Sequence, residues 1–371
     1  MGSHWIYTGS FIGALAISLI LVPLVRRIAI SRTIMDAPGG HKSHTLPVPY
    51  LGGLAMVVAF SVAVIAGALV RQDLSFVDGA ISFNPGGIFE PGASTLGELL
   101  LVLALALALS VMGLVDDLRG LHPYVRLAVE LGVAVALIAY GIQLKSPLPD
   151  SIDTIITVIW IIGITNAMNL LDNVDGLAAG VTGVAGATFF VLAYANNQPF
   201  TALLAIGLAG CTLGFLRSNF HPAKIYMGDA GSLYLGFLLS YIGLKIKVDS
   251  REISQFFVPA VVLGVALLDT TLVVISRIKR GVSPFEGGKD HVSHRLMRLG
   301  VSVRRGVTII LLAACMLGCI GIALSKAKSD VGYWMLASLA SMALVTTVLL
   351  TTKRAVLTVV TDAVDGSKSV A

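Results

Sequence analysis

Acidic side chains recur in short clusters along this 371-residue chain, at positions where hydrophobic runs end. Asp116 and Asp117 close one such run, and Asp172 and Asp175 follow another with a spacing of three residues. Neighbouring carboxylates are the hard oxygen ligands that Mg²⁺ or Mn²⁺ binds. An Asp-Asp pair alone is equally typical of a charged helix end, so each cluster gains meaning only from the residues around it.

Amide side chains precede the second acidic cluster. Asn166 and Asn169 can donate and accept hydrogen bonds with a nucleotide or a phosphate. A helix that continued through Asp172 would place its carboxylate on the same face as that of Asp175, whereas Asn173 indicates a turn. Both geometries let the two carboxylates converge, and two asparagines with two aspartates at a membrane boundary favour a functional site over a simple polar turn.

The segment 228–232, with the sequence Gly-Asp-Ala-Gly-Ser, is expected to open a helix. The free N–H groups and the positive dipole end of that helix could hold an anion. Capping of the helix by Asp229 or Ser232 is the structural alternative, and it is compatible with binding.

The longest polar loop, 277–305, combines eight cationic residues with His291 and His294. Its cations could neutralise a diphosphate or an anionic lipid, although most of them are interpreted as markers of membrane topology. No cysteine pair accompanies the histidines, so an oxygen-rich Mg²⁺ or Mn²⁺ site is favoured over zinc. Asp269 lies inside an apolar run, where a buried acid is either functional or paired with another helix.

The composition indicates a membrane protein, whose helices must position these residues. Hydrophobic residues make up 56% of the chain and charged residues only 13%, against about 25% in a soluble domain. Apolar runs that approach ~20 residues predict a polytopic, all-α bundle in one domain, 1–371. About eleven transmembrane helices are expected, at 8–27, 51–70, 96–115, 123–142, 152–171, 177–195, 199–216, 231–247, 256–276, 305–324 and 332–352.

The distribution of positive charge predicts the orientation. About 19 of the 26 Lys and Arg residues lie on the side that contains the loop after the first helix. By the positive-inside rule, the N-terminus is then outside and the C-terminus cytoplasmic, and the charge gives no indication of nucleic-acid binding. All the acidic motifs fall in loops of that cytoplasmic side, which predicts one active site built from the segments 28–50, 116–122, 166–176, 217–232 and 277–304.

Five motifs in this order resemble the polyprenyl-phosphate N-acetylhexosamine-1-phosphate transferases of glycosyltransferase family 4, which include the phospho-N-acetylmuramoyl-pentapeptide transferase of peptidoglycan synthesis. The resemblance covers nearly the whole chain. The matching residues are Asp36-Ala37-Pro38 with Lys42 and His44, Asp116-Asp117, Asn166 through Asp175-Gly176, Gly228-Asp229 with Gly231-Ser232, and the histidine loop.

The histidine loop bears on the branch of the family. The branch that uses UDP-N-acetylglucosamine usually has an HxHH pattern, and this chain is more similar to it, with the sequence His291-Val292-Ser293-His294. Ser293 replaces one histidine of that pattern. His41 stands where relatives commonly have an arginine before the lysine at Lys42.

The resemblance implies a Mg²⁺-dependent enzyme, with Mn²⁺ as an alternative ion, that transfers N-acetylhexosamine-1-phosphate from a UDP-sugar to undecaprenyl or decaprenyl phosphate and releases UMP. It implies a bacterial cytoplasmic membrane, with the active site facing the cytoplasm, and leaves open a homodimer. It assigns the metal to Asp117 and Asp229. Catalytic roles fall on Asp116, Asp117, Asp172 and His291, and substrate contacts on Lys42, His44, Asn166, Asn169, Asp175, His294 and Arg295.

Several alternatives stay open at this point. Asp116 is either a general base or an organiser of the lipid phosphate, and the reaction runs either in one step or through an aspartyl-phosphate. The competing functions are transfer of phospho-N-acetylmuramoyl-pentapeptide, an ion-coupled transporter and a catalytically inactive scaffold. A transporter should carry its ionisable residues near the bilayer midplane, which is not where most of them fall here.

Overall fold

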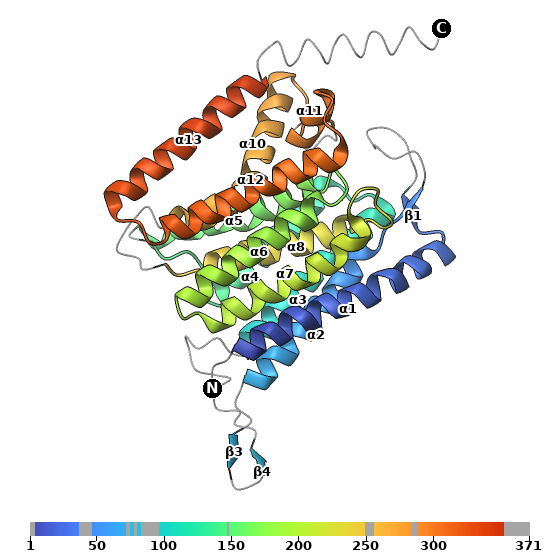
Figure 1. Ribbon diagram of the computed structural model, residues 1–371, viewed down its shortest axis with the longest axis vertical. Helices are drawn as coiled ribbons and strands as arrows, with labels where there is room; N and C mark the ends of the chain where they lie inside the picture. The colour runs from blue at the N-terminus through green and yellow to red at the C-terminus, as the bar shows by residue number, and fades with distance from the viewer. Residues whose placement is uncertain are drawn as a thin grey trace.

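The computed structural model describes residues 4–36, 47–71, 75–77, 80–82, 96–146, 148–248, 256–283 and 288–351. Within them the chain is almost entirely helical, with two small hairpins (Figure 1). The elements are α1 His4–Ser31, β1 Met35–Asp36, β2 Val48–Pro49, α2 Gly52–Arg71, β3 Ser75–Val77, β4 Ala80–Ser82, α3 Leu96–Arg119, α4 Pro123–Ala139, α5 Asp150–Leu171, α6 Leu177–Ala195, α7 Pro199–Asn219, α8 Gly228–Lys245, α9 Val258–Val262, α10 Gly264–Lys279, α11 Val292–Arg298, α12 Val303–Leu324 and α13 Ser329–Thr351.

The prediction of a polytopic helical membrane protein is confirmed. Eight of the helices in the described ranges are long and apolar enough to cross a bilayer. Their outward faces carry large apolar side chains, such as Ile20 at 69% exposure and Trp334 at 75%. Such faces are typical of contact with lipid, because a soluble surface would leave them in water.

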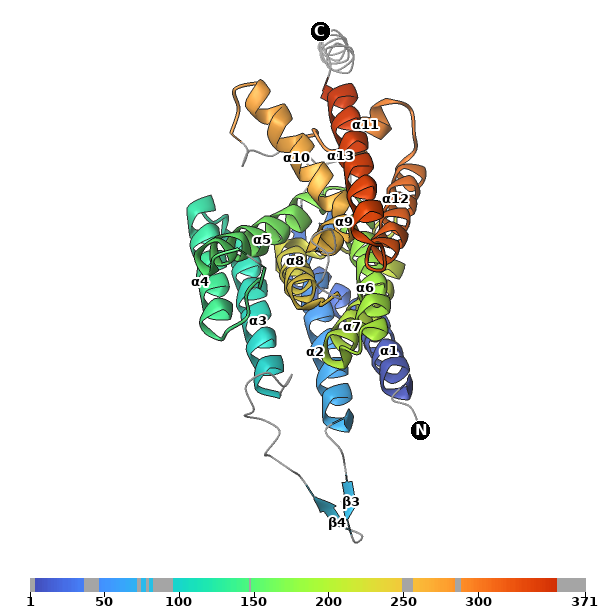
Figure 2. The same cartoon turned by 90° about the vertical axis from the view of Figure 1, so that its left-hand side faces the viewer.

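Three of the eleven expected spans correspond to helices outside those eight. Two of them are short, since α4 has 17 residues and α10 has 16. The third, α8, opens with a polar turn and is buried from Ala230 to Gly243, so it lies inside the bundle (Figure 2). A helix enclosed by other helices needs no lipid-facing surface.

Several expected boundaries differ from the structure by a few residues, and two of the differences bear on the site and the bundle. The third helix extends to Arg119 instead of residue 115, so Asp116 and Asp117 belong to its last turn, which Gly120 ends with a positive φ of 67°. The span expected at 256–276 is interrupted at Leu263, between α9 and α10. Its apolar residues continue through the interruption, which is why hydrophobicity alone did not reveal it.

The core forms around α8, which packs against α2, α3 and α5. A Cβ atom added at Gly53 of α2 would collide with the backbone of Gly231 in α8. Glycine at this position therefore brings two helices into backbone contact directly below the start of α8.

The β1–β2 hairpin and α11 lie at one end of the bundle, and the β3–β4 hairpin lies at the other (Figures 1 and 2). The chain starts α1 at the β3–β4 end and finishes α13 at the opposite end (Figure 1). Which end faces the cytoplasm stays a prediction from the charge distribution.

Candidate active site

A cavity of about 460 Å³ opens at the end of the bundle that carries β1 and α11. Each of the five segments expected to face the cytoplasm contributes at least one lining residue. Lys42 and His44, which belong to the first of these segments, lie outside the described residues. The acidic lining residues are Asp36, Asp117, Asp172, Asp175 and Asp229.

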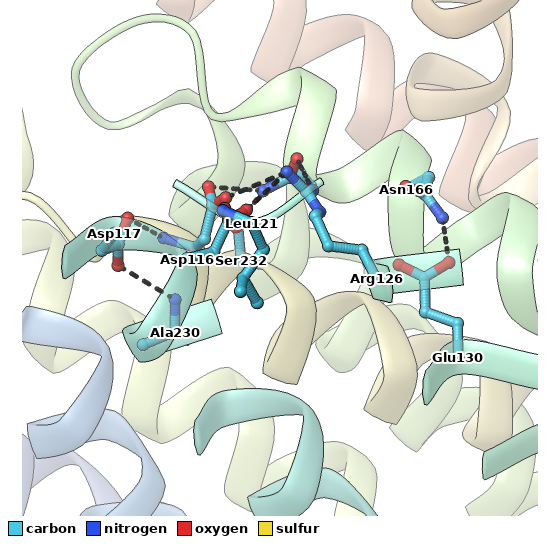
Figure 3. A network of polar contacts seen from close by, with 10 residues as sticks. Asp116, Asp117, Leu121, Arg126, Glu130, Asn166, Ala230 and Ser232 are labelled. Atoms are coloured by element: carbon cyan, nitrogen blue, oxygen red, sulfur yellow. Dashed lines mark hydrogen bonds and ion pairs between the residues drawn. The ribbon is translucent and has the colours of Figure 1, made fainter. Parts of the chain in front are cut away.

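Asp117 caps α8 from another helix. Its carboxylate accepts the N–H of Asp229 at 3.1 Å and that of Ala230 at 3.4 Å (Figure 3). The structural alternative of capping by Asp229 or Ser232 is absent, because the N-cap residue is Met227 and no side-chain cap bond is formed there. An anionic carboxylate at this position is stabilised by the free N–H groups and the dipole of the helix.

Gly228 makes the approach of Asp117 to α8 sterically feasible. Its φ is 68°, in the region that favours glycine. A Cβ atom at this position would collide with the Asp117 carboxylate. The Gly-Asp motif therefore brings two acids of different helices together at one helix end.

Arg126 of α4 joins three elements of the site. Its guanidinium pairs with Asp116 at 2.7 Å and with Asp229 at 3.3 Å, and it donates to Asn169 Oδ1 at 2.9 Å (Figure 3). The second oxygen of Asp116 accepts the backbone N–H of Leu121 at 2.6 Å. Asp116 is therefore held as the partner of Arg126, which favours the role of an organiser over that of a free base.

Asn169 occupies the centre of the same network. Its amide donates to Asp229 Oδ1 at 2.8 Å and to Ser232 Oγ at 2.9 Å. Because its carbonyl accepts from Arg126, the side chain ties α5 to α8 and α4. Asn169 also lines the cavity. Its contact with substrate stays a prediction.

Asp172 differs from its acidic neighbours because its carboxylate has no hydrogen-bond or ion-pair partner among the residues that the structure describes. Burial, together with the negative charges of Asp229, Asp117 and Asp175, raises its pKa to about 8. The residue follows α5 directly, and the next helix starts only after Gly176, so of the two geometries left open by the sequence the structure has the turn. A carboxylate in this setting is short of positive charge.

Asp175 is tied to the loop between α7 and α8. One of its oxygens contacts His221 Nδ1 at 2.8 Å and accepts the N–H of Ala223 at 2.9 Å. The same loop carries Tyr226, which lines the cavity and whose pKa burial raises. Asp175 thereby holds in place the loop from which Tyr226 lines the cavity.

The two histidines of the histidine loop lie in different surroundings. His291 is 3% exposed and contacts Asp269 Oδ2 through Nδ1 at 2.7 Å, so the intramembrane acid noted in the sequence has a partner. His294 lines the cavity. Burial lowers the pKa of His294 to about 4, with help from His291 and the cations of Lys289 and Arg298, and this keeps its imidazole neutral.

Two predicted substrate contacts lie away from the cavity lining. Asn166 donates to the buried Glu130 and to the carbonyl of Ile162. Arg295 donates to the carbonyl of Asp290 at 2.8 Å and lines a second, apolar cavity of about 360 Å³. Their roles, and that of His291, stay predictions.

The candidate residues predicted from the sequence did not include Arg126, Glu130, Tyr50 and Tyr226. Arg126 and Glu130 carried a usable signal, since both are charged residues inside the span expected at 123–142. The two tyrosines carried no such signal in the sequence. Both line the cavity, and an isolated β-bridge pairs the backbone of Tyr50 with that of Tyr226.

The donor groups of the cavity determine whether it fits Mg²⁺. Among the residues described, no three His, Cys, Asp or Glu side chains already form a ligand set. Protein-bound Mg²⁺ commonly uses only one or two carboxylates and completes its shell with water and substrate phosphates. Asp117 and Asp229 converge at one helix end and Asp172 is unpaired beside them, so the donor chemistry fits a divalent cation.

Known proteins provide an independent comparison. Residues 99–247, from α3 to just past α8, match the model of glycosyl transferase family 4. A Bacillus subtilis protein named "probable undecaprenyl-phosphate N-acetylglucosaminyl 1-phosphate transferase" is 33% identical over 82% of this chain and 80% of its own length.

Two further relatives have related names. A decaprenyl-phosphate N-acetylglucosaminephosphotransferase of Mycolicibacterium smegmatis is 29% identical over 78% of this chain and 74% of its own. The undecaprenyl-phosphate alpha-N-acetylglucosaminyl 1-phosphate transferase of Escherichia coli K12 is 24% identical over 84% and 82%. The match to the family model and the 33% identity to the Bacillus subtilis protein show that the chain belongs to glycosyl transferase family 4.

Proposed function

We propose that this protein transfers N-acetylglucosamine-1-phosphate from UDP-N-acetylglucosamine to a polyprenyl phosphate in the membrane and releases UMP. The observation that carries the proposal is the convergence of five chain segments on one acid-lined cavity at the end of a membrane bundle. The names of the relatives support polyprenyl phosphate and N-acetylglucosamine over the muramoyl-pentapeptide substrate. Membership of a transferase family removes the support for an ion-coupled transporter.

In this reaction an oxygen of the lipid phosphate attacks the phosphorus that carries the sugar. The bond from that phosphorus to the oxygen it shares with the other phosphate of the diphosphate breaks, and UMP leaves. Because the second pKa of a phosphate monoester is near 6, the attacking dianion is abundant at neutral pH and needs no dedicated base. Phosphoryl transfer then depends on positioning and charge neutralisation, which suits a site of fixed charges.

The residues of the cavity fit these needs. Asp117 and Asp229 would hold Mg²⁺, with Mn²⁺ as the alternative, and the bound ion would neutralise charge on the diphosphate. Arg126, which lies behind the cavity lining, holds Asp116 and Asp229 in place through its guanidinium. His294, as a neutral imidazole, can donate or accept a hydrogen bond to the nucleotide sugar.

We further propose that the cavity faces the cytoplasm of a bacterial inner membrane. Basic residues lie at the cavity end, where Arg26 and Arg304 donate to backbone carbonyls of the 220–227 loop. A membrane-impermeant maleimide tests this in a Cys315→Ser, Cys319→Ser background. Intact spheroplasts should label Asp150→Cys, and Lys289→Cys should react only after permeabilisation. Labelling of Lys289→Cys in intact spheroplasts would reverse the proposed orientation.

Purified protein, undecaprenyl phosphate and a panel of radiolabelled UDP-sugars test the reaction. We expect label transfer from UDP-N-acetylglucosamine that needs Mg²⁺ and stops with EDTA. Asp117→Asn and Asp229→Asn should lose transfer, whereas Asp150→Asn, which changes an exposed acid at the other end of α5, should retain it. Absence of transfer from every UDP-sugar by folded protein would overturn the proposal.

A further inference from the structure

The short helix α11 carries His294 into the cavity and is held from two sides. At its start, Asp269 of α10 accepts the N–H of Val292 at 2.7 Å and contacts His291 at 2.7 Å. On its other side, the hydroxyl of Ser293 donates to the side-chain carbonyl of Asn173, in the turn between α5 and α6. The first turn of α11 is thus bonded to two separate elements of the bundle.

Asn173 is itself fixed in orientation. Its amide nitrogen donates to the carbonyl of Leu170, near the end of α5, at 2.8 Å. Its oxygen is therefore presented at a defined point beside the cavity that both Asn173 and His294 line. Ser293 is 3% exposed, so its hydroxyl could not replace this bond by a hydrogen bond to solvent.

The position of α11 depends on such contacts because the helix has only seven residues. A helix of this length is not stable by itself and takes its geometry from tertiary bonds. The Asp269 contacts fix its first residues. The bond from Ser293 to Asn173 fixes its rotation toward the cavity, one residue before His294.

We propose that Ser293 is a positioning residue, whose hydrogen bond to Asn173 docks α11 against the α5–α6 turn and so places the His294 imidazole against the nucleotide sugar. Ser293 replaces a histidine of the HxHH pattern, so the docking bond belongs to this chain's own version of the histidine loop. The identity of the bound sugar rests on the proposed function, whereas the docking bond does not.

Ser293→Ala tests the proposal through steady-state kinetics with each substrate varied in turn. His294 is placed against the nucleotide sugar, so loss of this one buried hydrogen bond should lower kcat/KM for that substrate by about three- to ten-fold. His294→Ala should change the same constants more strongly, and adding Ser293→Ala to it should have little further effect. Ser293→Thr, which keeps the hydroxyl, should restore most of the function.

Ser325→Ala is the matched control, because it removes a hydroxyl that donates to the carbonyl of Ile322 at the far end of α12. It should leave all kinetic constants as in the wild type. Unchanged constants in Ser293→Ala, or additive effects of Ser293→Ala and His294→Ala, would overturn the positioning role.

Amide hydrogen exchange separates this inference from the proposed function. Ser293→Ala should speed exchange in residues 292–298 and leave the middle of α10 unchanged, whether or not the protein shows transfer. Unchanged exchange in α11 would overturn the docking bond. If wild-type protein shows no transfer with any UDP-sugar, the proposed function and the role of His294 fail together, and the exchange result still decides the docking bond.

Discussion

Replacing Asp172 by asparagine should make the metal-free protein more stable while it removes transfer activity. Asp172 is an unpaired acid among the described residues, and burial beside other carboxylates raises its pKa to about 8 from 3.8. The unfolded chain loses the proton near pH 4, whereas the folded chain keeps it until about pH 8. The contribution of this carboxyl to the free energy of unfolding therefore falls as pH rises through this window, because at this group the folded state binds more protons.

The size of the effect follows from the two pKa values. At pH 8 the full difference would correspond to roughly 5–6 kcal/mol. The side chain is partly exposed to the cavity, so solvent screening lowers the expected gain to ~2 kcal/mol. In a chain of this size, such a gain raises Tm by a few degrees.

Thermal unfolding in detergent with EDTA provides the assay. Asp172→Asn should exceed the wild type in Tm at pH 8 and approach it at pH 5, and Asp150→Asn should follow the wild type throughout. Added Mg²⁺ should stabilise the wild type more than Asp172→Asn, because the ion compensates a charge that only the wild type carries. If Asp172→Asn is no more stable than the wild type at pH 8 without Mg²⁺, the reasoning about this acid is refuted.

Three further changes test other parts of the site. Arg126→Lys keeps the charge but cannot contact Asp116, Asp229 and Asn169 together, so kcat/KM should fall about 10- to 100-fold, and transfer as active as that of the wild type would contradict this. Gly228→Ala should lower stability by ~1–3 kcal/mol in thermal unfolding, because it strains the backbone and displaces a carboxylate from the start of α8; an unchanged Tm would contradict the close approach. Because the pKa of His294 is lowered to about 4, the unfolded chain binds a proton that the folded chain does not between pH 6.5 and 4. This group should therefore cost the wild type roughly 1–3 kcal/mol relative to His294→Gln as pH falls from 7.5 to 4, opposite in sign to the contribution of Asp172. An unchanged stability difference between the two proteins across this range would refute the assignment.

The sequence predicted the membrane class and the position of most helices because lipid requires long apolar runs, and such runs are visible without a structure. It could not show the interruption at Leu263, where the residues stay apolar on both sides. Nor could it show that α8 is enclosed, since that depends on close contacts such as the one between Gly53 and Gly231.

The site, like the fold, was predictable from the sequence only in part. The acids of the cavity were predicted because they stand at the ends of hydrophobic runs, where a charge is costly without a partner. Which partner each acid has depends on helix packing. The pairing of Arg126 with Asp116 and Asp229, and that of His291 with Asp269, brings together residues on different helices, and no spacing along the chain encodes it.

The central claim is that the cavity transfers a sugar phosphate and not a sugar alone. The most direct measurement uses UDP-N-acetylglucosamine with ³²P in the phosphate next to the sugar, together with undecaprenyl phosphate and Mg²⁺. Label should appear in the lipid product in equal amount to the UMP released, and Asp229→Asn should release neither. Label that remains in UDP while sugar enters the lipid would contradict the account.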